Sequence, residues 1–413
     1  MPRRPAVATS IVAALGALGT LAACSTGPAS PDGSATTAAA SPTIPAATST
    51  TSPSPEPPSP STTTTTTASC AQRLLGTLGL EQKVGQLVMV GAQSGLTADR
   101  LDPVLLDQKA GGVVLLGNWT GAATVGGATK HWQPVGRAAA GGIGMLVAVD
   151  QEGGQVRHLR GTGFSTTPSA LSQGRAGTAG PNAARVAGEL KAVGVNVDLA
   201  PVADTVAASF AARNAPIGAY QREYGNDPAT VSRSVVAAVE GLQDGGVSAT
   251  LKHFPGLGRV TGNTDLTANG TTDSTTSADD AYLEPFRAGV SAGADLVMVS
   301  SALYPKLDPA NRASFSRAIL TGLLRERLGF DGVVISDDLG SARAVADVRP
   351  ADRATLFVAA GGDVVLTGLP STVPAMAGAL RDKAAAEPAF AAQVDAAVTR
   401  VLDLKVRRGL ATC

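Results

Sequence analysis

Short apolar runs, separated by amphipathic segments, dominate the chain from residue 80 onward. Val, Ile, Leu and Ala follow one another within each run, and a glycine often stands before it. Such continuous apolarity, without alternation, is typical of parallel strands that are buried on both faces. The runs predict eight strands, at residues 85–91, 111–117, 144–150, 195–202, 247–254, 295–301, 332–338 and 363–368.

The segments between these runs have the periodicity of helices. Residues 227–246, DPATVSRSVVAAVEGLQDGG, and residues 316–330, SRAILTGLLRERLGF, both place apolar side chains on one helical face. Eight strand–helix units in about 340 residues predict a (β/α)8 barrel, an α/β fold of the TIM-barrel type that forms a single domain. A doubly wound open sheet is the alternative, but such a sheet rarely needs so many regular units.

Charged residues gather at the carboxyl ends of the predicted strands. In a barrel of this kind the active site lies where the strands end and the following loops begin. One acid in such a position could simply cap the next helix, whereas a whole set at one rim predicts an active site. The set comprises Asp150, Asp204, Lys252, His253, Asp337 and Asp338.

The first part of the chain is expected to lie outside the barrel. Residues 1–24 combine Arg3 and Arg4 with a short apolar run that ends in LAAC, which predicts a lipoprotein signal peptide with Cys24 as the lipidated residue. An ordinary secretory signal is the alternative. Residues 25–69 are almost wholly Ser, Thr, Pro, Ala and Gly, which predicts a disordered tether. We therefore expect an exported protein, lipid-anchored at the outer face of the cytoplasmic membrane, with its domain at residues 70–413.

Two further cysteines bracket that domain. Cys70 stands at its start, and Cys413 is the last residue of the chain. In an exported protein such a pair indicates a disulfide that joins the two ends of the domain. Two unrelated thiols are the alternative. The disulfide requires adjacent ends, which a closed barrel supplies.

Composition narrows the possible partners and cofactors. The chain has 33 basic and 33 acidic residues without a basic block, so nucleic acid is not expected as a partner. The sequence lacks metal-ligand spacing around its 3 histidines, phosphate-loop or dinucleotide-binding glycines, and the G-x-S-x-G pattern of serine hydrolases. We expect no metal and no cofactor. After these exclusions, the remaining candidate chemistry uses carboxylates with cationic partners, and it suits the cleavage of glycosidic bonds.

Five motifs resemble those of a known family. They are VDQEGGQV (149–156), APVAD (200–204), REYG (222–225), LKHFPGLG (251–258) and VVISDDL (333–339). In this order, and over residues 70–413, the chain resembles the β-N-acetylhexosaminidases of glycoside hydrolase family 3. DQEGG and KHFPG together are highly specific. The resemblance implies a single (β/α)8 barrel that removes β-linked N-acetylglucosamine from cell-wall-type glycans by a retaining mechanism, through a covalent glycosyl-enzyme. We also expect a monomer.

The resemblance assigns roles to residues that match the family by position. Asp337 matches the nucleophile, although a helix-capping carboxylate is the alternative for an acid at a strand end. Asp150 matches the residue that hydrogen-bonds sugar hydroxyls, and such charge-assisted bonds are strong. Arg222 matches the arginine of the family's R-S-F-G segment. Lys252 and His253 match the pair that contacts the sugar.

The loop KHFPGLGRVTGNTD (252–265) departs from the family pattern. Relatives typically have K-H-F-P-G-H-G followed by D-S-H, whose Asp and His transfer the proton. Here Leu257 replaces the earlier histidine, Asn263 takes the position of the dyad aspartate, and Asp265 takes that of the dyad histidine. Three interpretations follow. Asp265 is itself the acid/base, or proton transfer is impaired and turnover slow, or the protein only binds sugar as a catalytically impaired envelope lipoprotein. We favour a glycosidase with altered acid/base chemistry.

Three aspects of substrate recognition and reaction stay open in the sequence. Trp119 and Trp132 follow the second predicted strand, where they either stack on a sugar or pack in the core. Either water or phosphate is chemically possible as the acceptor. The identity of the leaving group is not encoded in any of the motifs.

Overall fold

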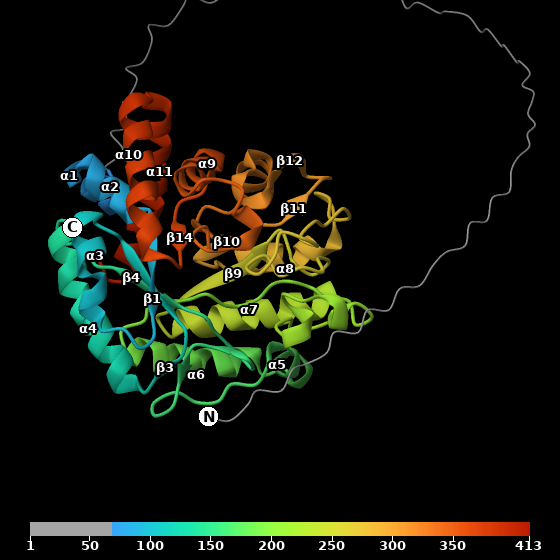
Figure 1. Cartoon of the computed structure of the whole chain (residues 1–413). Helices are drawn as coiled ribbons and strands as arrows, with labels where there is room; N and C mark the ends of the chain where they lie inside the picture. The colour runs from blue at the N-terminus through green and yellow to red at the C-terminus, as the bar shows by residue number, and fades with distance from the viewer. Residues whose placement is uncertain (1–67) are drawn as a thin grey trace, which may run out of the picture. The chain divides into compact units, whose positions relative to one another are not determined.

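The computed structural model describes residues 68–413, so the predicted signal peptide, Cys24 and residues 25–67 of the predicted tether lie outside the described residues. The described part of the chain is a closed ring of parallel strands with helices around it (Figure 1). This confirms the predicted (β/α)8 barrel. Within residues 68–413, no helix has the length and apolarity that crossing a membrane requires.

All eight predicted strands are present, in the order β13-β10-β9-β8-β4-β2-β1-β14. A parallel bridge between Ile335 and Val364 joins the two ends of this order and closes the barrel. Every neighbouring pair is parallel, so all carboxyl ends meet at one rim. The strands are β1 (Val88–Gln93), β2 (Gly112–Leu116), β4 (Leu146–Val149), β8 (Val197–Asp198), β9 (Ser248–Phe254), β10 (Leu296–Val299), β13 (Val333–Ser336) and β14 (Val365–Thr367).

Strand lengths follow the local sequence. β9 is the longest, and all seven of its residues are buried, including Lys252 and His253. β8 is much shorter than the predicted 195–202. Pro201 has no amide hydrogen to donate to the ladder, so regular pairing stops before it. Val202 keeps only an isolated bridge to Lys252.

Helices cover the outside of the barrel, and both helices expected from the sequence are present. Asp227 caps the first of them by accepting a 2.8 Å hydrogen bond from the Thr230 amide, and Pro228 occupies its first turn. The larger helices are α1 (Cys70–Thr77), α2 (Leu80–Gln86), α3 (Asp102–Asp107), α4 (Ala122–Ala139), α5 (Ala170–Ala176), α6 (Ala179–Ala192), α7 (Pro228–Asp244), α8 (Glu284–Ser291), the π-helical η6 (Ala318–Arg327), α9 (Pro350–Ala360), α10 (Val373–Ala386) and α11 (Pro388–Arg407).

The loops that follow the barrel strands contain short elements of their own. Two of the short strand pairs lie beside the site described below, because they belong to the loops after β2 and β4. The short strands are β3 (Trp119–Thr120), β5 (Gln151–Gly153), β6 (Val156–Arg157), β7 (Leu159–Arg160), β11 (Leu303–Tyr304) and β12 (Asp308–Arg312).

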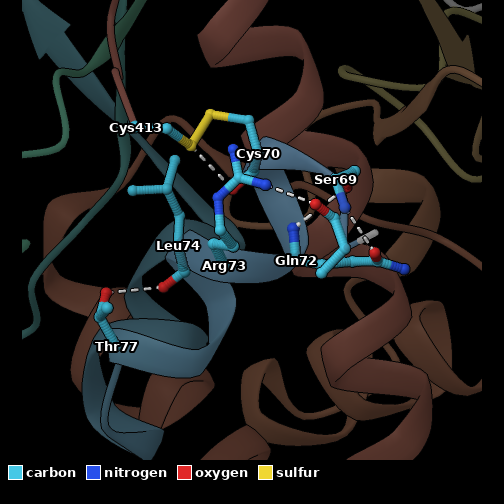
Figure 2. Close-up of a disulfide and its surroundings, with 8 residues drawn as sticks. Ser69, Cys70, Gln72, Arg73, Leu74, Thr77 and Cys413 are labelled. Atoms are coloured by element: carbon cyan, nitrogen blue, oxygen red, sulfur yellow. Dashed lines mark hydrogen bonds between the residues drawn. A yellow bond between two sulfur atoms is a disulfide. The ribbon is translucent and has the colours of Figure 1, made fainter. Parts of the chain in front are cut away.

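A disulfide between Cys70 and Cys413 joins the two ends of the domain, with the Cα atoms 5.8 Å apart (Figure 2). Ser69 and Gln72 form a capping box at the start of α1, next to this bond. The amide of Gly144, just before β4, donates a 2.7 Å hydrogen bond to the carbonyl of Leu410. The disulfide therefore lies at the amino ends of the strands, opposite the rim where they end.

Removing this disulfide by a Cys70→Ser/Cys413→Ser double substitution is expected to lower the free energy of unfolding by about 2–5 kcal/mol. The bond closes a loop of 343 residues in the unfolded chain, and releasing it returns conformational entropy to that state. Urea unfolding of the oxidised wild type and the double variant measures the difference. Since the disulfide lies at the opposite end from the rim, catalytic parameters should stay unchanged. If the double variant is fully folded but less active than the wild type, the disulfide and the rim are not independent.

Candidate active site

A cavity of about 310 Å³ opens at the carboxyl ends of the barrel strands. Asp150 follows β4, Asp337 follows β13, and Lys252 and His253 belong to β9. Barrel closure thus brings together side chains that are far apart in the sequence. The residues to which roles were assigned all line this cavity: Asp150, Arg222, Lys252, His253, Asn263, Asp265 and Asp337.

Lys252 lies at the floor of the cavity and is 1% exposed. Its Nζ contacts the Asp150 carboxylate and lies 2.6 Å from Oε1 of Glu152. Burial alone would lower the pKa of Lys252, but the two carboxylates outweigh burial and raise it. The lysine is therefore a fixed cation that holds Asp150 in place and leaves the second Asp150 oxygen for a ligand.

Arg222 reaches the same group from the loop before α7. Its Nε donates a 2.9 Å hydrogen bond to Oε2 of Glu152, and its Nη2 donates a 2.7 Å bond to Oε1. Burial alone would raise the pKa of Glu152, but the charges of Arg222 and Lys252 lower it to about 2. A bidentate pair of this kind fixes the arginine in one orientation. Glu152 is thus the anion that holds both cations of the site.

Replacing Glu152 with Gln is expected to lower the free energy of unfolding by about 3–5 kcal/mol at pH 7, because two buried cations lose their shared anion. The depressed pKa means that this stability is present above about pH 4.5 and is lost as the pH falls toward 2. Urea unfolding at several pH values measures it. The surface pair Lys383–Glu387 provides the control, since Glu387→Gln should cost less than about 1 kcal/mol. Equal costs would contradict the role of Glu152.

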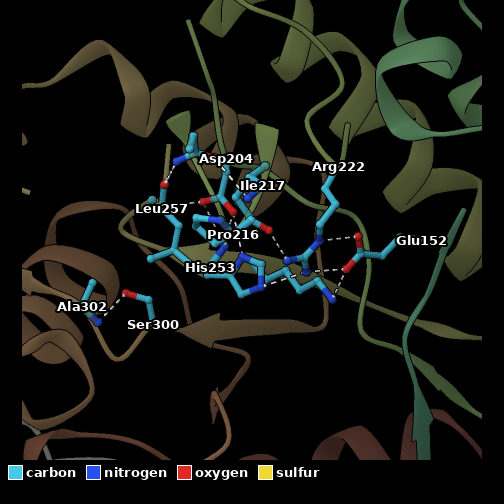
Figure 3. Close-up of polar contacts among 12 residues, drawn as sticks. Glu152, Asp204, Pro216, Ile217, Arg222, His253, Leu257, Ser300 and Ala302 are labelled. Carbon is cyan, nitrogen blue, oxygen red and sulfur yellow. Dashed lines mark hydrogen bonds and ion pairs between the residues drawn. The ribbon is translucent and has the colours of Figure 1, made fainter. Parts of the chain in front are cut away.

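His253 is held by Asp204 behind the cavity wall (Figure 3). Its Nδ1 donates to Oδ2 of Asp204 at 2.7 Å, and its Nε2 accepts from Nη2 of Arg222 at 3.3 Å. These two contacts fix the orientation of the imidazole ring. Asp204 also accepts a 2.8 Å bond from the Leu257 amide and is fully buried. It is not among the residues that line the cavity, so this strand-end acid positions His253 instead of facing a ligand.

Asp337 follows β13, and its backbone amide donates to the carbonyl of Val299 at 3.0 Å. Its Oδ1 accepts a 2.9 Å bond from the amide of Asp338, which points the carboxyl into the cavity that both residues line. Burial raises the pKa of Asp337. The neighbouring Asp338 carboxyl is used differently, because its Oδ1 accepts from the amides of Gly340 and Gly368 at 2.7 and 2.9 Å and holds the loop.

The departing loop brings Asp265 into the same cavity. The amide of Arg343 donates to the carbonyl of Asp265 at 3.2 Å, and the amide of Ala344 donates to that of Thr264 at 2.9 Å. These bonds tie the loop after β9 to the loop after β13. The two carboxyls, Asp265 and Asp337, therefore come from adjoining walls of one cavity.

Asp265 has the electrostatic character of a neutral acid. The residue as a whole is exposed at the cavity rim, and it lines the cavity together with Asp337 and Asp338. Desolvation there, together with the negative charges of Asp337 and Asp338, raises the pKa of Asp265 to about 7. Asp265 can therefore hold a proton near neutral pH while facing a second carboxyl.

Among the described residues, no hydrogen bond joins the Asn263 side chain to the Asp265 carboxyl. Its Oδ1 accepts a 2.9 Å hydrogen bond from the backbone amide of Asp265, which is the geometry of an Asx turn. The side chain therefore shapes the loop instead of orienting the acid. Leu257, at the position of the earlier histidine, is buried in the cavity wall and brings no proton-transfer group.

Sequence reasoning missed two polar residues of the site. Glu152 lies inside the DQEGG motif, but its role as the shared anion became visible only through its contacts. His158 lines the cavity, with Nδ1 donating to the carbonyl of Gly117 at 2.5 Å and Nε2 3.9 Å from Oδ2 of Asp150. Of the alternatives for Trp119 and Trp132, the structure shows packing: both are buried and lie edge to face, with ring centroids 6.2 Å apart.

No group of three or more His, Cys, Asp or Glu side chains within residues 68–413 is arranged to hold a metal ion. Asp150 and Glu152 contact the cations Lys252 and Arg222.

The barrel holds two carboxyls in one cavity, beside cations and hydrogen-bonding groups. This arrangement is the one that glycosidases with a (β/α)8 barrel use. Residues 79–404 match the glycosyl hydrolase family 3 N terminal domain. The chain is 34% identical over 410 residues to the beta-hexosaminidase LpqI of Mycobacterium tuberculosis, covering 96% of each protein.

Solved structures show the same likeness. A beta-N-acetylhexosaminidase from Beutenbergia cavernae superposes with a TM-score of 0.77 at 46% identity, over 80% of this chain and 99% of that one. The structure of M. tuberculosis LpqI superposes with a TM-score of 0.68 at 30% identity, over 79% and 94%. This chain belongs to glycoside hydrolase family 3.

Proposed function

We propose that this protein is a retaining β-N-acetylhexosaminidase that removes β-linked N-acetylglucosamine from cell-wall-type glycans. The proposal rests on one observation above the rest: Asp337 and Asp265 line the same cavity, where desolvation and the charges of Asp337 and Asp338 raise the pKa of Asp265 to about 7. Such a pair supplies a nucleophile and an acid. The related proteins named above carry the same activity in their names.

The proposed reaction has two steps. In the first, a carboxylate oxygen of Asp337 forms a bond to the anomeric carbon while the bond from that carbon to the leaving oxygen breaks. The proton of Asp265 passes to the leaving oxygen. In the second, Asp265 takes a proton from water, the water oxygen bonds to the anomeric carbon, and Asp337 is released.

The surrounding groups bind the sugar and stabilise its transition state. The free oxygen of Asp150 accepts from sugar hydroxyls, and Lys252 prevents that carboxylate from turning away. Arg222, fixed by Glu152, lines the same cavity and adds its positive charge to it. Interactions of this kind act by being in place before the charge develops.

The test is hydrolysis of 4-nitrophenyl N-acetyl-β-glucosaminide by the full chain, followed by proton NMR from the first minute, because its leaving group contributes no second reducing sugar. The β-anomer of free N-acetylglucosamine should form first, because two displacements retain configuration. Formation of the α-anomer first would overturn the retaining mechanism. Binding of N-acetylglucosamine without turnover would favour a sugar-binding protein that has lost catalysis. If a sugar phosphate forms only when phosphate is present, the acceptor is phosphate and not water.

We further propose that the protein is exported and lipid-anchored through Cys24. The motif LAAC and the Ser/Thr/Pro-rich stretch after it support this. The first described residues lie at the disulfide end of the barrel, opposite the cavity, so an anchored domain is attached by the end that does not carry the site. Detergent phase partitioning tests the proposal. The wild type should enter the detergent phase and Cys24→Ala should not, whereas identical partitioning would contradict lipidation.

A further inference from the structure

The rim of the catalytic cavity carries one aromatic side chain that is open to solvent. Tyr220 is 40% exposed and is the only Phe, Trp or Tyr among the described residues that line the cavity. Trp119 and Trp132, which the sequence offered as possible sugar-stacking residues, are only 4% and 1% exposed. An aromatic ring left in water at the mouth of a polar cavity is placed to receive an apolar face of a ligand.

The backbone around Tyr220 is fixed in an unusual conformation. Gln221, the next residue, has φ of 56°, in the left-handed region that residues other than glycine rarely adopt. Contacts on the far side hold it there, because the carbonyl of Gln221 accepts from the Leu171 amide at 3.3 Å and its Oε1 accepts from Ser169 Oγ at 3.1 Å. Such conformations persist where the surroundings enforce them, and they concentrate at ligand-binding positions.

The other side of the loop is held by a buried asparagine. Asn214 Oδ1 accepts from the amides of Ile217 and Gly218, at 3.1 and 2.7 Å. Arg222 completes the loop, since its Nη1 donates to the carbonyl of Pro216 at 2.8 Å (Figure 3). Tyr220 therefore projects from a loop whose ends are fixed by the site itself.

The same asparagine connects Tyr220 to the loop that carries the acid. Nδ2 of Asn214 donates to the carbonyls of Leu257 and Val260, at 2.7 and 2.8 Å. Both carbonyls belong to the segment between β9 and Asp265. The exposed aromatic ring and the proton donor to the leaving oxygen are thus held by one buried amide.

The cavity leaves little space for a second sugar. Its volume of about 310 Å³ is at the small end of the ~300–1,000 Å³ typical of ligand pockets, and its floor is occupied by the charged groups that would hold the first sugar. The leaving group must therefore lie at the rim, on the side of Asp265, which gives it the proton.

From these observations we propose that Tyr220 binds the leaving group, and that this group is a pyranose whose C–H face stacks on the phenol ring. The inference depends on the glycosidase function proposed above. It predicts a preference for sugar leaving groups over small alcohols that have no ring to stack. A rigid aromatic surface with few rotatable bonds provides such contact at low entropic cost.

The test compares two substrates that need the same acid assistance, N,N′-diacetylchitobiose and methyl N-acetyl-β-glucosaminide, in the full-length wild type, Tyr220→Ala and Tyr220→Phe. For Tyr220→Ala, kcat/KM for the disaccharide should fall roughly tenfold, the size expected for a stacking contact. For the methyl glycoside it should change less than about twofold. Tyr220→Phe keeps the ring and should retain wild-type preference for the disaccharide.

The outcomes separate this proposal from the proposed function. Equal loss on both substrates would assign Tyr220 to the shape of the site and overturn the stacking role, as would no loss on either. A failure of Tyr220→Phe to keep the preference would assign the effect to the hydroxyl instead of the ring. If the wild type hydrolysed neither substrate, the glycosidase function itself would fail. Leu266→Ala, at an exposed residue that does not line the cavity, is the control and should leave the preference unchanged.

Discussion

Replacing Asp337 with Asn is expected to lower kcat by about 10⁴–10⁶-fold, the size observed when the nucleophile of a covalent mechanism is removed. An amide of the same shape cannot form the glycosyl ester, so the first displacement has no attacking group. Release of nitrophenol from an aryl N-acetyl-β-glucosaminide by the full chain measures the loss. Nitrophenolate leaves without being protonated, so this substrate does not require the proton donor. The loss of kcat therefore reports on the nucleophile alone.

Asp338 provides a matched control for this prediction. It also lines the cavity and is the next residue, but its Oδ1 is occupied by backbone amides, including that of Gly340 at 2.7 Å. Asp338→Asn keeps an oxygen that can accept these bonds, so kcat should stay within about tenfold of the wild type. Azide added to Asp337→Ala should restore cleavage and give an α-linked glycosyl azide. Similar losses for the two Asn variants would contradict the assignment of Asp337.

The fold could be predicted from the sequence because each barrel strand is buried on both faces. That burial requires apolar residues on consecutive positions, which is a strong local pattern. The predicted boundaries were less accurate where pairing depends on a neighbour. In β8 only Val197 and Asp198 pair regularly, because Pro201 interrupts the ladder, and the apolar run itself gives no sign of where pairing ends.

The site was predictable to the extent that its residues stand at strand ends. Asp150, Lys252, His253 and Asp337 follow from that position and from the family motifs. Roles that depend on contacts were not predictable. Asp204 has the same strand-end appearance as Asp150, yet it is fully buried against His253.

Loop residues were the least accessible to sequence reasoning. Tyr220 projects into the rim because Gln221 adopts a positive φ and because Asn214 joins two loops that are more than forty residues apart in sequence. No periodicity encodes such bonds. Asn263 had been expected to occupy a catalytic position, and its hydrogen bond to the backbone amide of Asp265 shows a structural use that residue type alone does not indicate.

Replacing Asp265 with Ala is expected to lower kcat for N,N′-diacetylchitobiose by about 10²–10⁴-fold, the usual contribution of a general acid. Desolvation and the charges of Asp337 and Asp338 raise the pKa of Asp265 to about 7, so the carboxyl is protonated below that pH and ionised above it. Wild-type kcat should therefore fall as the pH rises through about 7. Burial also raises the pKa of Asp337, which must be ionised to attack, so activity should also fall toward acid pH.

The pH profile of the variant separates acid catalysis from a structural role. Asp265→Ala should lose the fall above about pH 7 and keep the acid limb, because Asp337 is still present. With a nitrophenyl leaving group the first step needs no proton, so the loss should be much smaller than with the disaccharide. Asn263→Ala is the control: its amide oxygen bonds only the backbone of Asp265 among the described residues, so it should leave the pH profile in place. An equal loss for both leaving groups, with the alkaline limb retained, would remove Asp265 from proton transfer.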